Sequence, residues 1–221
     1  VPDIGDVHTM GELLRGLGAE VAWDAENKRL TLVAERVDPD GLSFSLCRRI
    51  RASILLAAPV VLRAGRVRID MPGGDIIGRR RIESHLVGLR QLGAHVAGEQ
   101  RIDFRAEKGL HGGEVFLPEA SVTGTEQLLV AAAGARGRTV IRNAACEPHV
   151  CDVARMLAGM GAKIDGIGSN VLTVDGSDRL KGGCFRVASD HTEVGSFLAL
   201  VAATGGEATI GGIDRDHYRH S

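Results

Sequence analysis

The sequence predicts an α/β fold built from a threefold βαβαββ repeat, with buried helices inside and sheets outside. Three observations carry this prediction. Two different helical units occur three times each in strict alternation, and successive copies are roughly 70 residues apart. Each copy contains a glycine that suits a helix terminus. The residues after each helix alternate in polarity, as residues in half-buried strands do.

The first unit is an amphipathic helix. It reads TMGELLRGLGAEV at 9–21, SHLVGLRQLGAHV at 84–96 and DVARMLAGMGAKI at 152–164. In the first and third copies, apolar residues recur at positions i, i+3, i+4 and i+7, which places them in one stripe of a helix. The second copy is weaker because Gly88 falls in the stripe. We expect one short strand after each copy, for example at 19–21 and 162–164.

The second unit is an alanine-rich helix that is apolar on nearly all faces. It reads RASILLAAPVVLRAGRVRI at 51–69, TGTEQLLVAAAGARGRTVI at 123–141 and HTEVGSFLALVAATGGEATI at 191–210. A helix of this kind is buried all round. Pro59 should kink or shorten the first copy. The expected order within a repeat is strand, amphipathic helix, strand, buried helix, strand, strand.

The starts of the three apolar helices suggest an anion-attracting surface. Arg51, Thr123 and His191 align at these starts. If the helices are parallel, their positive N-terminal ends meet at one end of the domain. Together with the arginines at 79–81, they would attract phosphate-bearing ligands.

The composition excludes several functional classes. A net charge of -1 gives no overall case for nucleic acid, and 3% aromatic residues do not provide a base-stacking platform. No run of about 18 apolar residues exists, so no membrane span is expected. No signal peptide is recognised at the start of the chain. The four cysteines lack zinc-site spacing, so we expect reduced thiols, no metal and a cytoplasmic protein.

The stretch PGGDIIGRRR at 72–81 is the strongest candidate for chemistry. Its glycines allow the backbone to bend sharply and to approach a ligand closely. Its arginines suit phosphate or carboxylate, and Asp75 could handle a proton on an anionic substrate. The simpler alternative is a hairpin loop with solvated charges.

The chain resembles the enolpyruvyl transferase family over nearly its whole length. The motifs that carry the resemblance are VPDIGDVHTM, RASIL, PGGDIIGRRR, SHLVGLRQLGA, SVTGTEQLL, TVIRNAACEPHVCDVARML and SDHTEVGSFL. PGG and RNAACEP are the more specific motifs, and they match the branch that acts on UDP-N-acetylglucosamine. The resemblance implies an inside-out α/β barrel. It also implies transfer of an enolpyruvyl group from phosphoenolpyruvate to the sugar 3-hydroxyl, the first committed step of peptidoglycan synthesis, without a metal or organic cofactor.

The resemblance assigns the phosphoenolpyruvate site and the proton donor. Arg51 and Arg80 match arginines that contact phosphoenolpyruvate. Asp75 stands where most members carry a reactive cysteine, although some carry aspartate. A carboxylic acid with a raised pKa can deliver the proton but cannot form the covalent thioether. We therefore expect resistance to fosfomycin, which alkylates that cysteine.

The resemblance also places UDP-sugar contacts at two segments. These are Arg81, Ile82, Glu83 and Ser84, and then Ser121, Val122 and Thr123. The family has proline in place of Arg81 and usually aspartate in place of Glu83. Glu119 stands where some relatives have lysine, so a cationic contact to the diphosphate is expected to be missing. His85 follows Ser84 in the helix stripe and has two interpretations, a ligand contact and a packed core histidine.

The expected partners are these two small-molecule substrates, with no nucleic acid and no membrane. We expect residues 1–189 to form the loop-bearing catalytic domain, with three repeats of which the first is incomplete. Residues 190–221 would start a second domain or end the third repeat. Since the family's second domain supplies further groups, we expect this chain alone to be inactive. Two alternatives are an enolpyruvyl transferase with another acceptor, such as a nucleotide or shikimate phosphate, and a non-catalytic binding module of the same fold.

Overall fold

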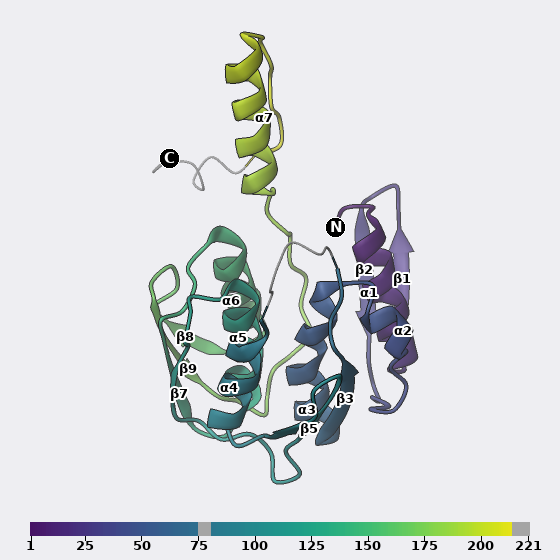
Figure 1. The fold of residues 1–221 in the computed structure, drawn as a ribbon, viewed down its shortest axis with the longest axis vertical. Helices are drawn as coiled ribbons and strands as arrows, with labels where there is room; N and C mark the ends of the chain where they lie inside the picture. The colour runs from purple at the N-terminus through teal and green to yellow at the C-terminus, as the bar shows by residue number, and fades with distance from the viewer. Residues whose placement is uncertain (75–80, 214–221) are drawn as a thin grey trace.

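The computed structural model describes residues 1–74 and 81–213, and it shows an α/β fold with three sheets around a set of helices (Figure 1). The sheet of β7, β8 and β9 lies on one side, and helices α4, α5 and α6 cover its inner face. Helix α3 lies against β3 and β5 next to these helices, and α1 with β1 and β2 forms the far side.

The three amphipathic helices form where the sequence predicts them. They are α1 (Gly5–Gly16), α4 (Glu83–Gln91) and α6 (Pro148–Gly159). Each is followed by an antiparallel hairpin, namely β1 (Glu20–Asp24) with β2 (Arg29–Val33), β4 (His95–Ala97) with β5 (Arg101–Arg105), and β8 (Lys163–Asp165) with β9 (Val171–Asp175).

This hairpin changes the expected strand order. Two strands, not one, follow each amphipathic helix, and a third, β6 (Glu114–Phe116), follows the second hairpin. In residues 1–189, called the compact part below, a single strand follows each buried helix: β3 (Arg66–Asp70) after α3 and β7 (Arg138–Arg142) after α5. Two of the tight turns depend on glycines with positive φ, Gly98 and Gly166, where a side chain would be strained.

The sheets join consecutive repeats. Strand β3 comes after the first buried helix, yet it pairs with β5 of the second repeat in the order β3-β5-β4. Strand β7 comes after the second buried helix and pairs with β9 of the third repeat in the order β6-β7-β9-β8. The β6–β7 pair is parallel, whereas the other strand pairs in the described residues are antiparallel.

The first two alanine-rich segments form the buried helices, as predicted. The first is a 3-10 helix, η1 (Arg51–Leu56), that continues into α3 (Ala57–Ala64). Pro59 lies in the first turn of α3, so the regular helix is shortened as expected. A short helix, α2 (Phe44–Cys47), precedes η1. The second segment is α5 (Val122–Gly134), which packs against α3, α4 and α6.

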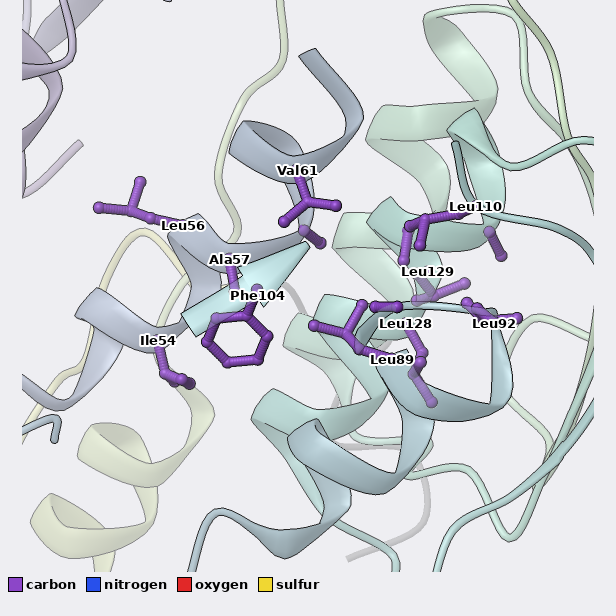
Figure 2. Packing of buried hydrophobic residues seen from close by; sticks show 14 of the residues in the cluster. Ile54, Leu56, Ala57, Val61, Leu89, Leu92, Phe104, Leu110, Leu128 and Leu129 are labelled. Carbon is purple, nitrogen blue, oxygen red and sulfur yellow. The ribbon is translucent and has the colours of Figure 1, made fainter. Parts of the chain in front are cut away.

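The core lies between the buried helices and the strands. Phe104 of β5 lies beside Ile54 and Ala57, while Leu89 of α4 faces Leu128 of α5 (Figure 2). Gly88 allows the two helices to come this close, because a Cβ there would lie 2.6 Å from Leu128 Cδ2. Gly88, which interrupts the predicted apolar stripe, is therefore required for the close packing of α4 against α5.

The third alanine-rich segment departs from the prediction. It forms α7 (His191–Thr204), but this helix stands away from the rest of the chain (Figure 1). Val194 is its one buried residue, whereas Phe197, Leu198 and Leu200 are 48%, 56% and 57% exposed. The prediction that all three apolar helices are buried was wrong for α7 in this structure, because residues 1–189 do not cover it.

Candidate functional site

The N-terminal ends of η1, α4 and α5 meet at one end of the compact part. Arg51, the first residue of η1, donates from Nη2 to the carbonyl oxygen of Arg81 at 2.9 Å, just before α4. His85 in the first turn of α4 lies 3.0 Å from Thr123 Oγ1, measured from Nε2, in the first turn of α5. The positive ends of these helices therefore converge, as predicted for Arg51 and Thr123, whereas His191 begins α7, which stands away from the rest of the chain.

The start of α5 offers backbone donors. Ser121 is the N-cap, and its Oγ accepts from the Gly124 backbone N–H at 3.2 Å. The first N–H groups of an α-helix have no carbonyl oxygen one turn earlier to bind. The N–H groups of Val122 and Thr123 are in this position, so they point out of the N-terminal end of α5. Free N–H groups and the helix dipole together suit a phosphate group.

Thr125 ties α5 to the segment before α6. Its hydroxyl donates to the carbonyl oxygen of Ser121 at 2.7 Å and accepts from the Ala145 backbone N–H at 2.9 Å. Thr125 is fully buried, so both roles of the hydroxyl are met inside the protein. This double contact fixes the RNAACEP segment beside the start of α5.

A buried polar cluster links α4 to α5. His85 is 2% exposed; its Nδ1 contacts Gln127 Oε1, and its Nε2 lies 3.0 Å from Thr123 Oγ1. With the amide oxygen facing Nδ1, a neutral ring donates from Nδ1–H and accepts the Thr123 hydroxyl proton at Nε2. Burial is the main cause that lowers the pKa of His85 to about 4; the hydrogen bond to Gln127 acts to raise it, and the charge of Arg51 lowers it further. The ring is therefore neutral at neutral pH. Gln127 Nε2 is buried and has no hydrogen-bond partner among the described residues.

The base of the PGG segment is held by a buried carboxylate. Asp70 is 1% exposed; Arg101 Nε donates to its Oδ1 at 2.8 Å, and Arg48 Nη2 lies 2.7 Å from its Oδ2. Burial acts to raise the pKa of Asp70, but the two arginines outweigh it and hold the pKa below its usual value. Gly73 lies so close to Arg48 that a Cβ would come within 1.5 Å of the Arg48 carbonyl oxygen. The contacts of Asp70 and the close approach of Gly73 to Arg48 therefore hold the start of the PGG segment in place.

The structure brings together only part of the predicted site. Asp75 and Arg80 lie outside the described residues. Arg81 is exposed at the end of the segment, and Gly74 lies against Arg51, with a Cβ position 3.3 Å from the Arg51 backbone nitrogen. This contact brings the PGG segment to the start of η1, where the family resemblance predicts an arginine that contacts phosphoenolpyruvate.

The predicted UDP-sugar residues on α4 differ in exposure. Ile82 is part of the hydrophobic core, and Ser84 is 1% exposed with its Oγ donating to Glu119 Oε1 at 3.4 Å. Glu83 is exposed and lies 3.8 Å from Arg90 Nη1. The Ser84–Glu119 contact connects α4 to the segment before α5, so the two predicted contact segments are neighbours.

Sequence reasoning missed an acidic pair, Glu126 and Glu147. Burial, and then the charge of Glu147, raises the pKa of Glu126 on α5 to about 7. Glu147 is the N-cap residue of α6, and its Oε2 is buried without a hydrogen-bond partner among the described residues. The available signal was Glu126 and Gln127, two adjacent polar residues inside an otherwise apolar helix.

The described residues hold no group of three or more His, Cys, Asp or Glu side chains placed to bind a metal ion. Within the same residues, no helix combines the length and apolarity that crossing a bilayer requires.

A family model described as EPSP synthase (3-phosphoshikimate 1-carboxyvinyltransferase) matches residues 1–221. Among curated relatives, UDP-N-acetylglucosamine 1-carboxyvinyltransferase of Bradyrhizobium diazoefficiens is 48% identical over 219 residues, which cover 99% of this chain and 50% of that protein. The protein of the same name from Borreliella burgdorferi is 46% identical over 223 residues, covering 99% and 51%. The chain thus spans about half the length of the curated relatives it matches.

Solved structures show the same fold at lower identity. The enolpyruvyl transferase NikO from Streptomyces tendae gives a TM-score of 0.76 at 21% identity, covering 89% of this chain and 47% of that one. An EPSP synthase from Acinetobacter baumannii gives a TM-score of 0.68 at 23% identity, covering 95% of this chain and 49% of that one. At these identities the likeness concerns the fold alone.

Proposed function

The chain belongs to the EPSP synthase family, and from this premise we propose that it is the loop-bearing part of an enzyme that transfers the enolpyruvyl group of phosphoenolpyruvate to the 3-hydroxyl of UDP-N-acetylglucosamine. The observation that carries the proposal is the convergence of the η1, α4 and α5 N-terminal ends beside Arg51. Two anionic substrates need such a surface. The names of the curated relatives support the choice of acceptor.

The substrates are proposed to divide this surface between them. Arg51 and Arg80 bind phosphoenolpyruvate, because arginine holds phosphate and carboxylate through paired hydrogen bonds. The UDP-sugar extends from the start of α4, at Arg81, Ile82, Glu83 and Ser84, to the N-terminal end of α5, with its diphosphate at Ser121, Val122 and Thr123. The adjacency of Ser84 and Glu119, and of His85 and Thr123, supports one continuous binding surface.

Asp75 is proposed as the acid of the reaction. The 3-hydroxyl gives its proton to a base as its oxygen bonds to C2 of phosphoenolpyruvate, and C3 takes up a proton from an acid. A base then removes a proton from C3 while the C2–O bond to phosphate breaks, which restores the C2–C3 double bond and releases phosphate. A protonated carboxyl group can supply the proton at C3. It cannot form a thioether to the substrate, so the covalent branch open to cysteine is absent. With UDP-N-acetylglucosamine as the acceptor, the proposed reaction is the first committed step of peptidoglycan synthesis.

The proposal includes the architecture and location of the whole protein. Residues 1–189 are proposed to form the loop-bearing domain of an inside-out α/β barrel, and residues 190–221 to begin a second domain or to end the third repeat. The exposed apolar side chains of α7 support this division, because such a helix needs cover from another part of a protein. The four free cysteines, all within the described residues, support a reducing compartment such as the cytoplasm.

Phosphate release by the full-length protein tests the function. Wild type should release phosphate only when both phosphoenolpyruvate and UDP-N-acetylglucosamine are present. Asp75→Asn should reduce kcat by about 100-fold or more, because general acid–base groups contribute on that scale. A panel with 3-phosphoshikimate and free nucleotides identifies the acceptor. Turnover with one of these and none with the UDP-sugar would overturn the proposed substrate.

Fosfomycin tests the role of Asp75 independently. Wild type should keep its activity after prolonged incubation, because a carboxylate is not alkylated as a thiolate is. Asp75→Cys is the matched variant, and it should become sensitive in a time-dependent manner. Rapid inactivation of wild type at low fosfomycin concentration would show that another nucleophile occupies the site.

A further inference from the structure

The His85 cluster carries an inference about how the diphosphate site is tuned. Thr123 and Gln127 are four residues apart, so they lie on the same face of α5, and this face meets the start of α4. His85 lies between them and has a partner on each ring nitrogen. The three side chains form one continuous chain of hydrogen bonds from the interior to the N-terminal end of α5.

This chain of hydrogen bonds has two possible directions, because a neutral imidazole has one N–H donor and one acceptor. In the structure, Gln127 Oε1 faces His85 Nδ1, and because an amide oxygen only accepts, this arrangement requires the Nδ1–H tautomer, in which Nε2 accepts the Thr123 hydroxyl proton. In the reverse direction, Gln127 Nε2 donates to Nδ1, His85 Nε2–H donates to Thr123 Oγ1, and the Thr123 hydroxyl proton is free to donate elsewhere. A half-turn of the Gln127 amide and a change of imidazole tautomer convert one into the other.

The two directions suit different states of the site. The direction with the amide oxygen facing Nδ1 leaves Gln127 Nε2 buried without a partner among the described residues, and it directs the Thr123 hydroxyl proton to His85 Nε2. The reverse direction gives that nitrogen a partner and presents a hydroxyl donor beside the free N–H groups of Val122 and Thr123. An anion at the end of α5 accepts hydrogen bonds and offers none, so it favours the reverse direction.

We propose that His85 is a positioning residue that, with Gln127, turns the Thr123 hydroxyl proton toward the diphosphate of the bound sugar nucleotide. The inference rests on the proposed function and adds a role for two residues that do not touch the substrate. Because His85 is 2% exposed and its ring is neutral, its effect passes through Thr123 and does not involve a direct charge on the ligand.

A double-mutant cycle in the full-length protein tests this role, with UDP binding measured by isothermal titration calorimetry. Thr123→Val should raise the Kd for UDP about tenfold or more, the scale of a hydrogen bond to a charged group. His85→Phe should also raise it, but His85→Phe combined with Thr123→Val should bind no more weakly than Thr123→Val alone. Additive losses would overturn the inference, because His85 would then act independently of Thr123.

Two further measurements separate positioning from a general effect on folding. His85→Gln keeps a side-chain donor that can reach Thr123, so it should recover much of the UDP affinity that His85→Phe loses. In steady-state kinetics, the KM for UDP-N-acetylglucosamine should rise in His85→Phe while the KM for phosphoenolpyruvate stays within about twofold. Equal increases in both KM values would contradict the proposal.

The imidazole tautomer gives a direct readout. With ¹⁵N-labelled histidine and His85→Gln to assign the signal, the UDP complex should show His85 protonated on Nε2. Protonation on Nδ1 in the complex would overturn the inference. If wild type binds UDP and turns over the UDP-sugar while the cycle is additive, only this inference fails. If wild type binds neither UDP nor the UDP-sugar, the proposed function fails first and this inference fails with it.

Discussion

A methyl group added at Gly88 should force α4 and α5 apart. The Cβ of Gly88→Ala would lie 2.6, 2.8 and 3.0 Å from Leu128 Cδ2, Cδ1 and Cγ. Leu128 is fully buried in the core, so its side chain can move only by displacing its packed neighbours. Overpacking of this kind costs about 1–3 kcal/mol, whereas alanine gains about 1 kcal/mol over glycine in helix propensity. The expected net loss is about 1 kcal/mol, with about 2 kcal/mol as the upper figure.

Gly11→Ala provides the matched control. Gly11 is also inside an amphipathic helix, α1, but its added Cβ would lie 3.6 Å from Val21 Cγ1, an ordinary contact. The control should therefore stabilise the chain by up to about 1 kcal/mol. Urea unfolding curves of both variants, followed by far-UV circular dichroism, measure the difference. If Gly88→Ala proves as stable as Gly11→Ala, the close approach of α4 and α5 is not a real constraint.

The same substitution should affect ligand binding. Gly88 lies one helical turn from His85, so moving α4 away from α5 lengthens the 3.0 Å contact between His85 and Thr123. At a temperature where the full-length wild type and the Gly88→Ala protein are both fully folded, the variant should bind UDP more weakly than wild type. A loss of stability alone would not change the affinity under these conditions. Unchanged affinity would separate helix spacing from the binding site.

Three other predictions follow from charge and exposure. Asp70→Asn should lower the free energy of unfolding by about 1–3 kcal/mol at neutral pH. Because the pKa of Asp70 is lowered in the folded chain, this difference between variant and wild type should persist above about pH 4 and shrink as the pH falls further. Urea titrations at several pH values measure it. Glu126 has its pKa raised to about 7, so the folded chain should lose stability as pH rises from about 4.5 to about 7, and Glu126→Gln should flatten that slope; an unchanged slope would assign it to other groups. Leu198→Asp should leave the melting temperature of the 221-residue chain unchanged but lower that of the full-length protein, and an equal drop in both would show that α7 already packs within residues 1–213.

The sequence predicts helices well where the spacing of apolar residues marks the buried face. Apolar residues at helical spacing located α1, α4 and α6, and Pro59 marked where the regular α3 helix begins. The first strand after each amphipathic helix was expected, but the second strand of each hairpin, β2, β5 and β9, was missed. Each of these is five residues long, and the repeat pattern assigned only one strand between an amphipathic helix and the next buried helix. The exposed state of α7 was missed because an apolar helix is buried only if a partner surface is present.

The site divides in the same way. The N-cap role of Ser121 and the capping by Asp190, whose Oδ1 accepts from the Thr192 and Glu193 N–H groups, follow from residue type and position. The alignment of Arg51, Thr123 and His191 correctly predicted that the first two helix ends meet, but the third helix, α7, stands away from the rest of the chain. The contacts of His85 with α5 and of Asp70 with Arg101 depend on helix packing and strand register, which one sequence does not encode in a local pattern.

The way the strands are shared has a consequence for how such a fold can be divided. Strand β3 belongs by sequence to one repeat and completes the sheet of the next, and β7 does the same one step further along. A single repeat cut out at its sequence boundaries would therefore carry an unpaired strand and lack another. Its open edges would favour pairing with a second copy or aggregation. The repeats are thus interlocked, and the smallest unit able to fold alone is larger than the unit that was duplicated.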